Sequence, residues 1–384
     1  MSLSITSKLP NIATNIFSIM SGLAMEHKAI NLSQGFPDYP ISDTLIALVS
    51  KAMQDGNNQY APMIGIPALR NALVKKVEKL YKTSINPDTE ITITPGGTYA
   101  IYTALTTILQ PLDEVILLEP AYDSYIPNIE MNGAKAICVP LRFPTYSIDW
   151  ELVQQAITSK TKAIIINTPH NPTGYVWTKS DLEQLDKLTS GTNIFIISDE
   201  VYEHITMDGL VHESVLKYPS LLARSFVIFS FGKVFHTTGW KMGYCIAPEN
   251  WMAEFRKIHQ FESFSCNTPM QVALAEFLQH EEEYLQLPTF FQHKRDFFLD
   301  QISALPFTIL QPASGSYFQL VAYDKISDMP DKEFAIWLTK NMGVASIPVS
   351  AFHAHTKSNN LLRFCFAKKE ETILQAMRNL KQLC

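Results

Sequence analysis

The sequence predicts an α/β protein in which helices cover both faces of a sheet, followed by a smaller α+β unit. Three observations support this prediction. Short apolar runs alternate with helical patterns from residue 90 to 248, which is typical of a sheet buried on both faces. Polar or glycine-containing turns follow several of these runs, at the positions where open α/β sheets bind ligands. From about residue 290 the alternation gives way to a shorter mixture of helices and strands.

The composition is that of a mildly acidic globular protein. In 384 residues, 31 basic and 37 acidic side chains give a formal net charge of −6, so we expect no nucleic acid and no membrane as a partner. The length suggests two or three domains. Five scattered cysteines without a CxxC pair favour free thiols in a reducing compartment. Because the sequence has no signal-peptide pattern and no apolar run near the ~18–20 residues of a membrane span, we expect a cytoplasmic protein.

Before residue 90 the chain shows three features. There is a helix-compatible patch at 16–20, a loop rich in Gly, Pro and Asp at 31–38, and a turn-rich stretch at 58–67 that leads into a helix at 68–74. The loop at 31–38, taken alone, favours a simple turn. Tyr60 is either a phenol that faces a ligand or an ordinary half-buried aromatic residue.

Seven apolar runs are the strand candidates of the main sheet: 90–94, 114–118, 136–139, 162–166, 193–197, 226–229 and 244–247. A turn with two glycines at 95–98 separates the first run from a helix predicted at 99–109. Such a turn exposes unpaired N–H groups at the positive end of the helix, which suits a phosphate. Two adjacent glycines alone remain weak support, because turns of this kind also occur without a ligand.

Three further strand ends carry aromatic or polar groups. Tyr122 follows the run at 114–118, Asn171 follows the run at 162–166, and Asp199 follows the run at 193–197. Pro172 favours an extended backbone at Asn171, so that its amide can point into a cleft. The carboxylate of Asp199 needs a partner, because an unpaired buried charge is costly. Either a basic side chain or a protonated ring nitrogen of a ligand meets that need.

The strongest candidate site follows the run at 226–229. Ser230, Lys233 and Lys241 lie in a loop punctuated by glycines, which allows the backbone to fold tightly around a small ligand. Burial or a neighbouring cation lowers the pKa of an amine and makes it a nucleophile. Lys233 is therefore suited to a Schiff base with an anionic aldehyde whose phosphate Ser230 and Lys241 hold. The alternative is a solvated surface lysine, the commonest situation for this residue.

Beyond residue 250 the sequence predicts helices at 252–264 and 268–286, with Leu-Pro at 287–288 breaking the second. A helix at 294–302, a strand at 316–321, a helix at 332–340 and a strand at 361–366 follow. Arg363 lies inside the apolar run of the last strand and requires an anion. The residues alone favour a structural carboxylate over a ligand there.

Taken together, the motifs resemble those of the fold-type I, class I and II pyridoxal-5′-phosphate aminotransferases, and most of all the methionine (aromatic) and kynurenine–glutamine subgroup. The resemblance runs from residue 31 to Arg363 and rests on Asn-Pro-Thr-Gly at 171–174, Ser-Asp-Glu-Val-Tyr at 198–202, Ser-Phe-Gly-Lys at 230–233 and Gly-Trp-Lys-Met-Gly at 239–243. It implies a three-layer αβα large domain with a mostly parallel seven-stranded sheet. It also implies an N-terminal arm at 1–40, the large domain at 41–285 and a small α+β domain at 286–384.

The resemblance also implies roles for individual residues and no metal. Lys233 would bind the cofactor covalently and move the substrate proton, while Asp199 would pair with the protonated pyridine nitrogen. Tyr202 and Asn171 would hydrogen-bond the ring oxygen, and Tyr122 would stack on the ring. The residues implied at the phosphate are Gly97, Thr98, Ser230, Lys241 and, from the partner subunit of a homodimer, Tyr60. The residues implied at the substrate carboxylate are Arg363, Asn171 and the Gly35 backbone.

Lys241 departs from the arginine that many relatives carry, and it resembles the kynurenine and methionine subgroup in this respect. No obvious second arginine is present for a distal carboxylate, and Phe36, Tyr60, Ile64 and Phe352 are candidates for an apolar pocket. Methionine or an aromatic amino acid is therefore the expected donor, with a 2-oxo acid as acceptor. A carbon–sulfur β-lyase is the nearest alternative. A regulatory module lacks the expected basic helix-turn-helix segment, and a nicotinamide enzyme lacks a GxGxxG turn.

Overall fold

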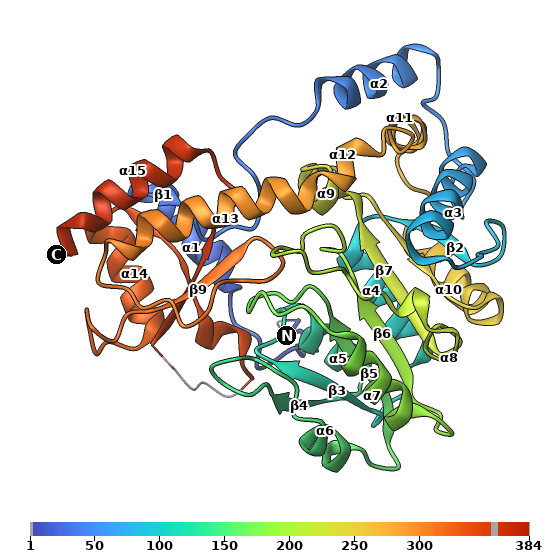
Figure 1. Ribbon diagram of the computed structural model, residues 1–384. Coiled ribbons are helices and arrows are strands. Elements are labelled where there is room, and N and C mark those ends of the chain that lie inside the picture. Colours follow the sequence, from blue (N-terminus) through green and yellow to red (C-terminus); the bar gives the residue numbers. More distant parts are fainter. Residues whose placement is uncertain (1–2, 355–359, 384) are drawn as a thin grey trace.

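The computed structural model describes residues 3–354 and 360–383 and is built on a seven-stranded sheet with the order β2-β8-β7-β6-β5-β3-β4 (Figure 1). Neighbouring strands pair in parallel, except that β8 runs antiparallel to both β2 and β7. The strands are β2 Ile91–Thr94, β3 Glu114–Glu119, β4 Lys135–Pro140, β5 Thr161–Asn167, β6 Phe195–Asp199, β7 Ser225–Ser230 and β8 Gly243–Ile246.

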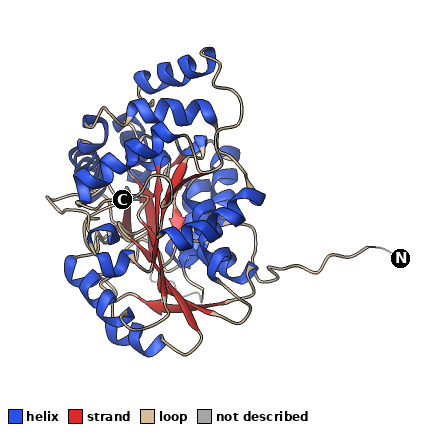
Figure 2. Cartoon of the chain, turned by 90° about the vertical axis from the view of Figure 1, so that its right-hand side faces the viewer, coloured by secondary structure: helices blue, strands red, loops and turns tan. Residues whose placement is uncertain are grey.

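Helices lie on both sides of this sheet, so that the sheet is the middle of three layers (Figure 2). The helices that follow its strands are α4 Gly97–Ile108, α5 Tyr125–Met131, α6 Trp150–Ala156, α7 Lys179–Thr189, α8 Pro219–Leu222, α9 Phe231–Val234 and α10 Glu249–Glu262. Three more helices belong to the first third of the chain: α1 Ile16–Glu26, α2 Asp43–Gln54 and α3 Pro67–Tyr81. The residues before α1 extend away from the body of the molecule (Figure 2).

Local sequence explains why these elements form. In β5 the three isoleucines at 164–166 are all buried, as expected for a parallel strand covered by helices on both faces. Helix α7 begins with a capping box in which the Thr178 and Asp181 side chains satisfy each other's backbone N–H groups. Helix α3 carries a proline in its first turn, where the missing N–H costs no hydrogen bond.

The last strands of the chain form a smaller three-stranded antiparallel sheet with the order β11-β12-β9. Its strands are β9 Phe318–Ala322, β11 Ile347–Pro348 and β12 Leu361–Cys365. The helices that follow α10 in the chain are α11 Thr268–Phe277, α12 Glu282–Leu285, α13 Leu287–Ser303, α14 Asp331–Asn341 and α15 Glu370–Leu380. Strand β1 Ile30–Asn31 pairs in parallel with β10 Val344–Ala345, so the N-terminal segment joins this C-terminal unit.

The predicted α/β class and the seven predicted strands are confirmed, with ends that move by at most two residues. The long helix predicted at 268–286 was wrong, because the chain forms α11 and the short α12 instead. Pro288 does not end a helix as predicted but stands in the first turn of α13. The cysteines at 138, 245, 266 and 365 are free, and Cys384 lies outside the described residues.

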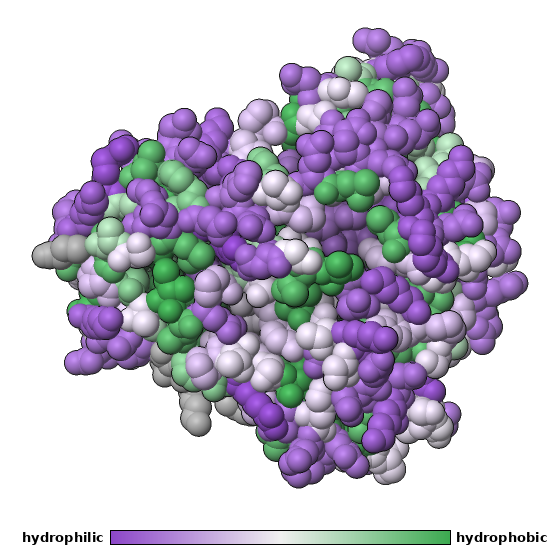
Figure 3. All heavy atoms as spheres, viewed as in Figure 1, coloured by the Kyte–Doolittle hydropathy of each residue, from purple (hydrophilic) through white to green (hydrophobic). Residues whose placement is uncertain are grey.

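Polar side chains cover most of the face seen in Figure 1, with apolar residues gathered in smaller patches between them (Figure 3). None of the helices formed by residues 3–354 and 360–383 is long and apolar enough to cross a membrane.

Candidate functional site

A cavity of about 340 Å³ opens where β5, β6 and β7 end at their carboxyl termini. The main sheet contributes Asn171, Asp199 and Lys233 to its lining, and segments far away in the sequence contribute Gly35 and Arg363. Ligands of open α/β sheets bind at this edge, because the loops that follow parallel strands meet there. The cavity is therefore the candidate site.

Lys233 lies in the short helix α9, directly after strand β7, and its side chain points into the cavity. The ammonium Nζ donates to the Tyr317 hydroxyl at 2.9 Å and to the Gly35 carbonyl at 3.2 Å. Burial lowers the pKa of Lys233 to about 8, and the positive charges of Arg363 and Lys241 act in the same direction. An amine of this kind is deprotonated at a lower pH than a surface lysine and attacks aldehydes more readily.

Tyr317 is a site residue that the sequence did not indicate. Its hydroxyl also donates to the Gly35 carbonyl at 2.6 Å, so one carbonyl oxygen receives both Tyr317 and Lys233. The residue stands just before β9 and is completely buried among aromatic rings. In the sequence it looks like any other core aromatic residue, so no local signal distinguishes it.

Asp199 ends strand β6, and its carboxylate faces the cavity with no cationic side chain bonded to it in the described chain. Oδ2 accepts from the Tyr125 hydroxyl at 2.6 Å, and Oδ1 accepts from the Val201 backbone N–H at 3.3 Å. Burial raises the pKa of Asp199 to about 6 despite these hydrogen bonds. The carboxylate is thus ready for a cationic group of a ligand. The sequence places the Tyr125 ring near the site but does not reveal its hydrogen bond to Asp199.

The glycine turn after β2 and the loop before β8 form an anion cradle. Gly96 has a φ of 87°, and the backbone N–H groups at the start of α4 point out of the helix. A Cβ at Gly96 would lie 3.6 Å from Lys241 Nζ, which shows how closely this ammonium approaches the turn. Ser230 and Thr98 line the same part of the cavity. The helix N-terminus, a hydroxyl and a cation together suit a phosphate.

Arg363 is 1% exposed, and no carboxylate within the described residues forms an ion pair with it. Its guanidinium donates through Nη1 to Asn171 Oδ1 at 2.7 Å and through Nη2 to the Ser33 carbonyl at 2.8 Å. Nε has no hydrogen-bond partner there, and the Phe318 ring lies 3.8 Å from the guanidinium carbon. Because a buried cation requires an anion, this arrangement favours a ligand carboxylate over the structural carboxylate.

Two tyrosines, Tyr122 and Tyr202, also line the cavity. Tyr202 is buried, and its ring packs edge-on against Tyr317 with a centroid distance of 5.3 Å. Burial raises the pKa of Tyr202 above its usual value, so its hydroxyl stays protonated and can donate. Burial likewise raises the pKa of Tyr122 to about 12. Tyr122 lines the cavity beside Thr98.

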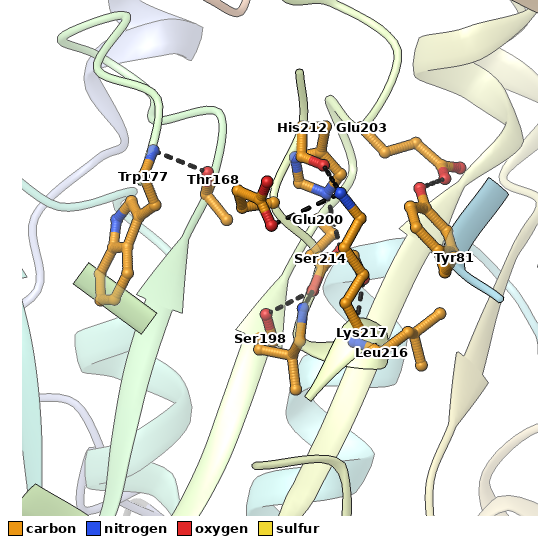
Figure 4. A network of polar contacts seen from close by, with 12 residues as sticks. Tyr81, Thr168, Trp177, Ser198, Glu200, Glu203, His212, Ser214, Leu216 and Lys217 are labelled. Carbon is orange, nitrogen blue, oxygen red and sulfur yellow. Dashed lines mark hydrogen bonds and ion pairs between the residues drawn. The ribbon is translucent and has the colours of Figure 1, made fainter. Parts of the chain in front are cut away.

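Glu200, the neighbour of Asp199, does not line the cavity and is bonded to other residues of the protein. Its Oε1 accepts from the Ser198 hydroxyl at 2.9 Å and the Val215 N–H at 3.0 Å, and its Oε2 lies 2.7 Å from His212 Nε2 (Figure 4). All of its carboxylate bonds therefore point away from the cavity, behind the strand end.

The structure brings nearly all predicted site residues to one cavity: Gly35, Gly97, Thr98, Tyr122, Asn171, Asp199, Tyr202, Ser230, Lys233, Lys241 and Arg363. Tyr60 is the exception, since it is 84% exposed, contacts Phe264, and does not line the cavity of its own chain. The predicted apolar pocket residues Phe36, Ile64 and Phe352 do not line it either. Phe352 lies next to the Arg363 guanidinium, at 5.1 Å.

Comparison with known proteins places this geometry among related enzymes. The family model for aminotransferase class I and II matches residues 27–380. The chain is 46% identical to methionine aminotransferase of Escherichia coli over 378 residues, which cover 98% of both chains. It is 35% identical to kynurenine–oxoglutarate transaminase 3 of Rattus norvegicus, covering 95% of this chain and 87% of the relative.

A solved structure shows the same similarity. The crystal structure of YbdL from Escherichia coli, described as identifying a methionine aminotransferase function, superposes with a TM-score of 0.96 at 45% sequence identity. The match covers 99% of this chain and 100% of that chain. The two chains therefore share the fold over nearly their full length.

Proposed function

The chain belongs to the class I and II aminotransferases, and from this premise we propose that L-methionine is its preferred amino donor, followed by amino acids with aromatic or glutamine-like side chains. The enzyme depends on pyridoxal 5′-phosphate and transfers an amino group from an amino acid to a 2-oxo acid. The methionine aminotransferase of E. coli, 46% identical over the full length, supports the donor. Arg363 is the single arginine among the residues that line the cavity, which disfavours a distal carboxylate.

The residues of the cavity fit this cofactor. Lys233, whose pKa is lowered by burial, suits an aldehyde. The glycine turn at Gly96, with the Lys241 ammonium beside it, suits a phosphate. A buried carboxylate without a cationic partner suits a protonated pyridine nitrogen. When bound, pyridoxal 5′-phosphate supplies a carrier for the amino group and a ring that stabilises negative charge at the substrate Cα.

We propose the following roles for the residues at the reacting atoms. Lys233 would hold the cofactor covalently through Nζ and would take the proton from the substrate Cα. Asp199 holds the pyridine nitrogen in its protonated form. Tyr202 donates to the ring oxygen and Asn171 Nδ2 does the same, because Asn171 Oδ1 is occupied by Arg363. Tyr122 lies on the ring face and excludes water from it.

The remaining roles concern the two anionic groups. Gly97, Thr98, Ser230 and Lys241 hold the phosphate. Arg363 binds the substrate α-carboxylate as a bidentate pair, and the Gly35 backbone and Asn171 border the same place. The neutralisation of Arg363 by the substrate carboxylate removes the cost of an unpaired buried cation, so substrate binding stabilises the folded chain.

We also propose a homodimer in which Tyr60 reaches the phosphate of the partner subunit. Its 84% exposure and its distance from the cavity of its own chain support this assignment. We propose the division into an arm at 1–40, a large domain at 41–285 and a small domain at 286–384, supported by the pairing of β1 with β10. Four free cysteines support a reducing compartment, and we propose the cytoplasm.

The absorption spectrum of the purified holoenzyme tests the donor. We expect L-methionine, added without an oxo acid, to convert the cofactor band into that of the pyridoxamine form, and a 2-oxo acid to restore it. L-aspartate at the same concentration should convert the band more slowly. Faster conversion by aspartate would refute the methionine preference. Release of pyruvate and ammonia from a cysteine conjugate without an oxo acid would show the β-lyase activity instead.

A further inference from the structure

The segment that carries Tyr202 lacks a regular backbone. Between the end of β6 and residue 206 it forms successive turns, in which the Glu203 N–H donates to the Glu200 carbonyl at 3.0 Å and the Ile205 N–H donates to the Tyr202 carbonyl at 2.7 Å. Neither a helix nor a strand therefore fixes the Tyr202 ring. Its far end is held by residues 314–316, where the Ser316 N–H donates to the Ile205 carbonyl at 2.9 Å. The part nearer to β6 has to be held by side chains.

Two buried carboxylates anchor the segment from behind. Glu200, two residues before Tyr202, is bound by Ser198, His212 and the Val215 N–H (Figure 4). Glu203, one residue after Tyr202, is 4% exposed and accepts from the Tyr81 hydroxyl at 2.6 Å (Figure 4). The two anchors stand on either side of the tyrosine along the chain.

The anchor at Glu203 is an ion pair with helix α3. Lys76 Nζ lies 2.5 Å from Glu203 Oε1, with side-chain exposures of 5% and 2%. Although burial opposes ionisation, Lys76 lowers the pKa of Glu203 to about 2. The Tyr244 hydroxyl lies 3.3 Å from Lys76 Nζ, and the Tyr284 ring lies 5.6 Å away. Such a pair is no strong source of stability by itself, because both charges lose their hydration.

We propose that the Lys76–Glu203 ion pair positions Tyr202 for the cofactor, so that helix α3 sets the hydrogen bond from Tyr202 to the ring oxygen. Lys76 and Glu203 touch neither substrate nor cofactor and act through the turn that Glu203 shares with Tyr202. The inference rests on the proposed role of Tyr202. A positioning role gives a reason for a buried ion pair at a place where apolar residues would also pack.

The pH midpoint of the cofactor absorption band in the holoenzyme tests this proposal. A donor to the ring oxygen withdraws negative charge from it, and without that donor the oxygen holds the neighbouring proton more firmly. Tyr202→Phe therefore raises the midpoint and serves as the reference. We expect Glu203→Gln to raise it in the same direction by roughly 0.5–1 pH unit. We also expect kcat to fall about tenfold with a smaller change in KM.

The direction of the shift separates positioning from simple electrostatics. Loss of a negative charge at position 203, without movement of Tyr202, disfavours a nearby cation and lowers the midpoint. Tyr81→Phe removes one hydrogen bond to Glu203 and keeps both charges, so it provides a milder test if Glu203→Gln folds poorly. We expect Tyr81→Phe to raise the midpoint as well, by less than Glu203→Gln.

Asp88→Asn is the matched control, because Asp88 lies in the turn after α3 and pairs with a residue of that helix. Asp88 is 75% exposed and pairs with Arg70 of α3 at 2.7 Å, so this variant removes an α3 ion pair that does not contact the Tyr202 segment. We expect its midpoint and kcat to equal those of the wild type.

The outcomes distinguish the proposed role of Tyr202 from its positioning by Lys76 and Glu203. If Tyr202→Phe leaves the midpoint unchanged, the proposed role of Tyr202 is wrong. If Tyr202→Phe raises the midpoint while Glu203→Gln and Tyr81→Phe lower it or leave it unchanged, the role of Tyr202 stands and the positioning by Lys76 and Glu203 is overturned.

Discussion

Burial disfavours the charged forms of three ionisable residues that line the cavity. Burial lowers the pKa of Lys233 to about 8 and that of Arg363 to about 10, and it raises the pKa of Asp199 to about 6. Within residues 3–354 and 360–383 none of the three forms an ion pair, and the attraction between Lys233 and Asp199 does not restore an ordinary pKa to either. A folded chain without ligands therefore carries a free-energy cost at these residues, which the cofactor and the substrate relieve.

Asp199 makes this cost measurable in the apoprotein. Its folded pKa of about 6 lies above its ordinary 3.8, so the folded chain binds the proton more tightly than the unfolded chain. Its favourable contribution is present below pH 4 and is lost as the pH rises through 6. We expect Asp199→Asn to raise the free energy of unfolding of the apoprotein at pH 7.5 by about 2–3 kcal/mol in urea titrations, while turnover of the loaded enzyme collapses.

The exposed residue Asp300 provides the control, since Asp300→Asn should leave the stability of the apoprotein unchanged. The gain for Asp199→Asn should also shrink when the titration is repeated at pH 5, because the wild-type carboxyl is then largely protonated. A loss of stability at pH 7.5 would contradict the argument.

The sequence predicts charged residues of the site better than neutral ones. Lys233 and Arg363 stand out because a cation within or beside an apolar run needs an explanation. Tyr317 does not stand out, since it lies beside the apolar run of β9, where a core aromatic residue would also occur. Ser33 contributes only its backbone carbonyl, a group that every residue has, so no residue type could reveal it.

At the scale of elements, the anion cradle depends on how closely two strand ends approach. A Cβ at Gly243, the first residue of β8, would lie 2.6 Å from the Phe229 carbonyl oxygen and 3.0 Å from the Gly96 carbonyl carbon. Strand β8 therefore lies against β7 and the glycine turn at a distance that only glycine permits. This contact carries Lys241, two residues earlier, to the start of α4.

Gly243→Ala tests this dependence. We expect the variant to lose about 1–3 kcal/mol of stability and to release pyridoxal 5′-phosphate faster on dialysis, because β8 must move away from Gly96. Gly239→Ala in the same loop is the matched control, since a Cβ there meets nothing within 4 Å. Equal cofactor retention in the two variants would show that the approach of β8 is not needed for the cradle.

Element boundaries were predictable where apolar periodicity met a turn residue, as at the strands β3 and β7. They were not predictable where tertiary packing decides. No proline or glycine interrupts the stretch from 270 to 286, yet α11 ends at Phe277 and packs against α2 and α3. Pro288 was misread because a proline ends one helix and begins another with equal ease.

At the scale of the whole molecule, the proposed dimer would make each site a product of two chains. Lys233 and Tyr60 of one chain lie apart, so they would serve different sites. Co-refolding of a Lys233→Ala chain with a Tyr60→Ala chain tests this. Random assembly into dimers would give about a quarter of the sites both native residues, so we expect about that share of wild-type activity from two weakly active variants.

Each variant refolded alone is the control, and light scattering reports the dimer directly. Activity of the mixture equal to the average of the separate variants would place Tyr60 in its own site or in none.

Strand β12, at the centre of the small sheet, lies near the end of the chain and is therefore made late during synthesis. All strands of the main sheet, and with them the phosphate cradle and Lys233, precede residue 250, whereas Arg363 arrives on a strand that must insert between β9 and β11. Its bond to Ser33 closes a loop of 330 residues. The residues proposed to hold the cofactor are thus synthesised before Arg363, and the grip on a substrate carboxylate is the last part of the site to be completed during translation.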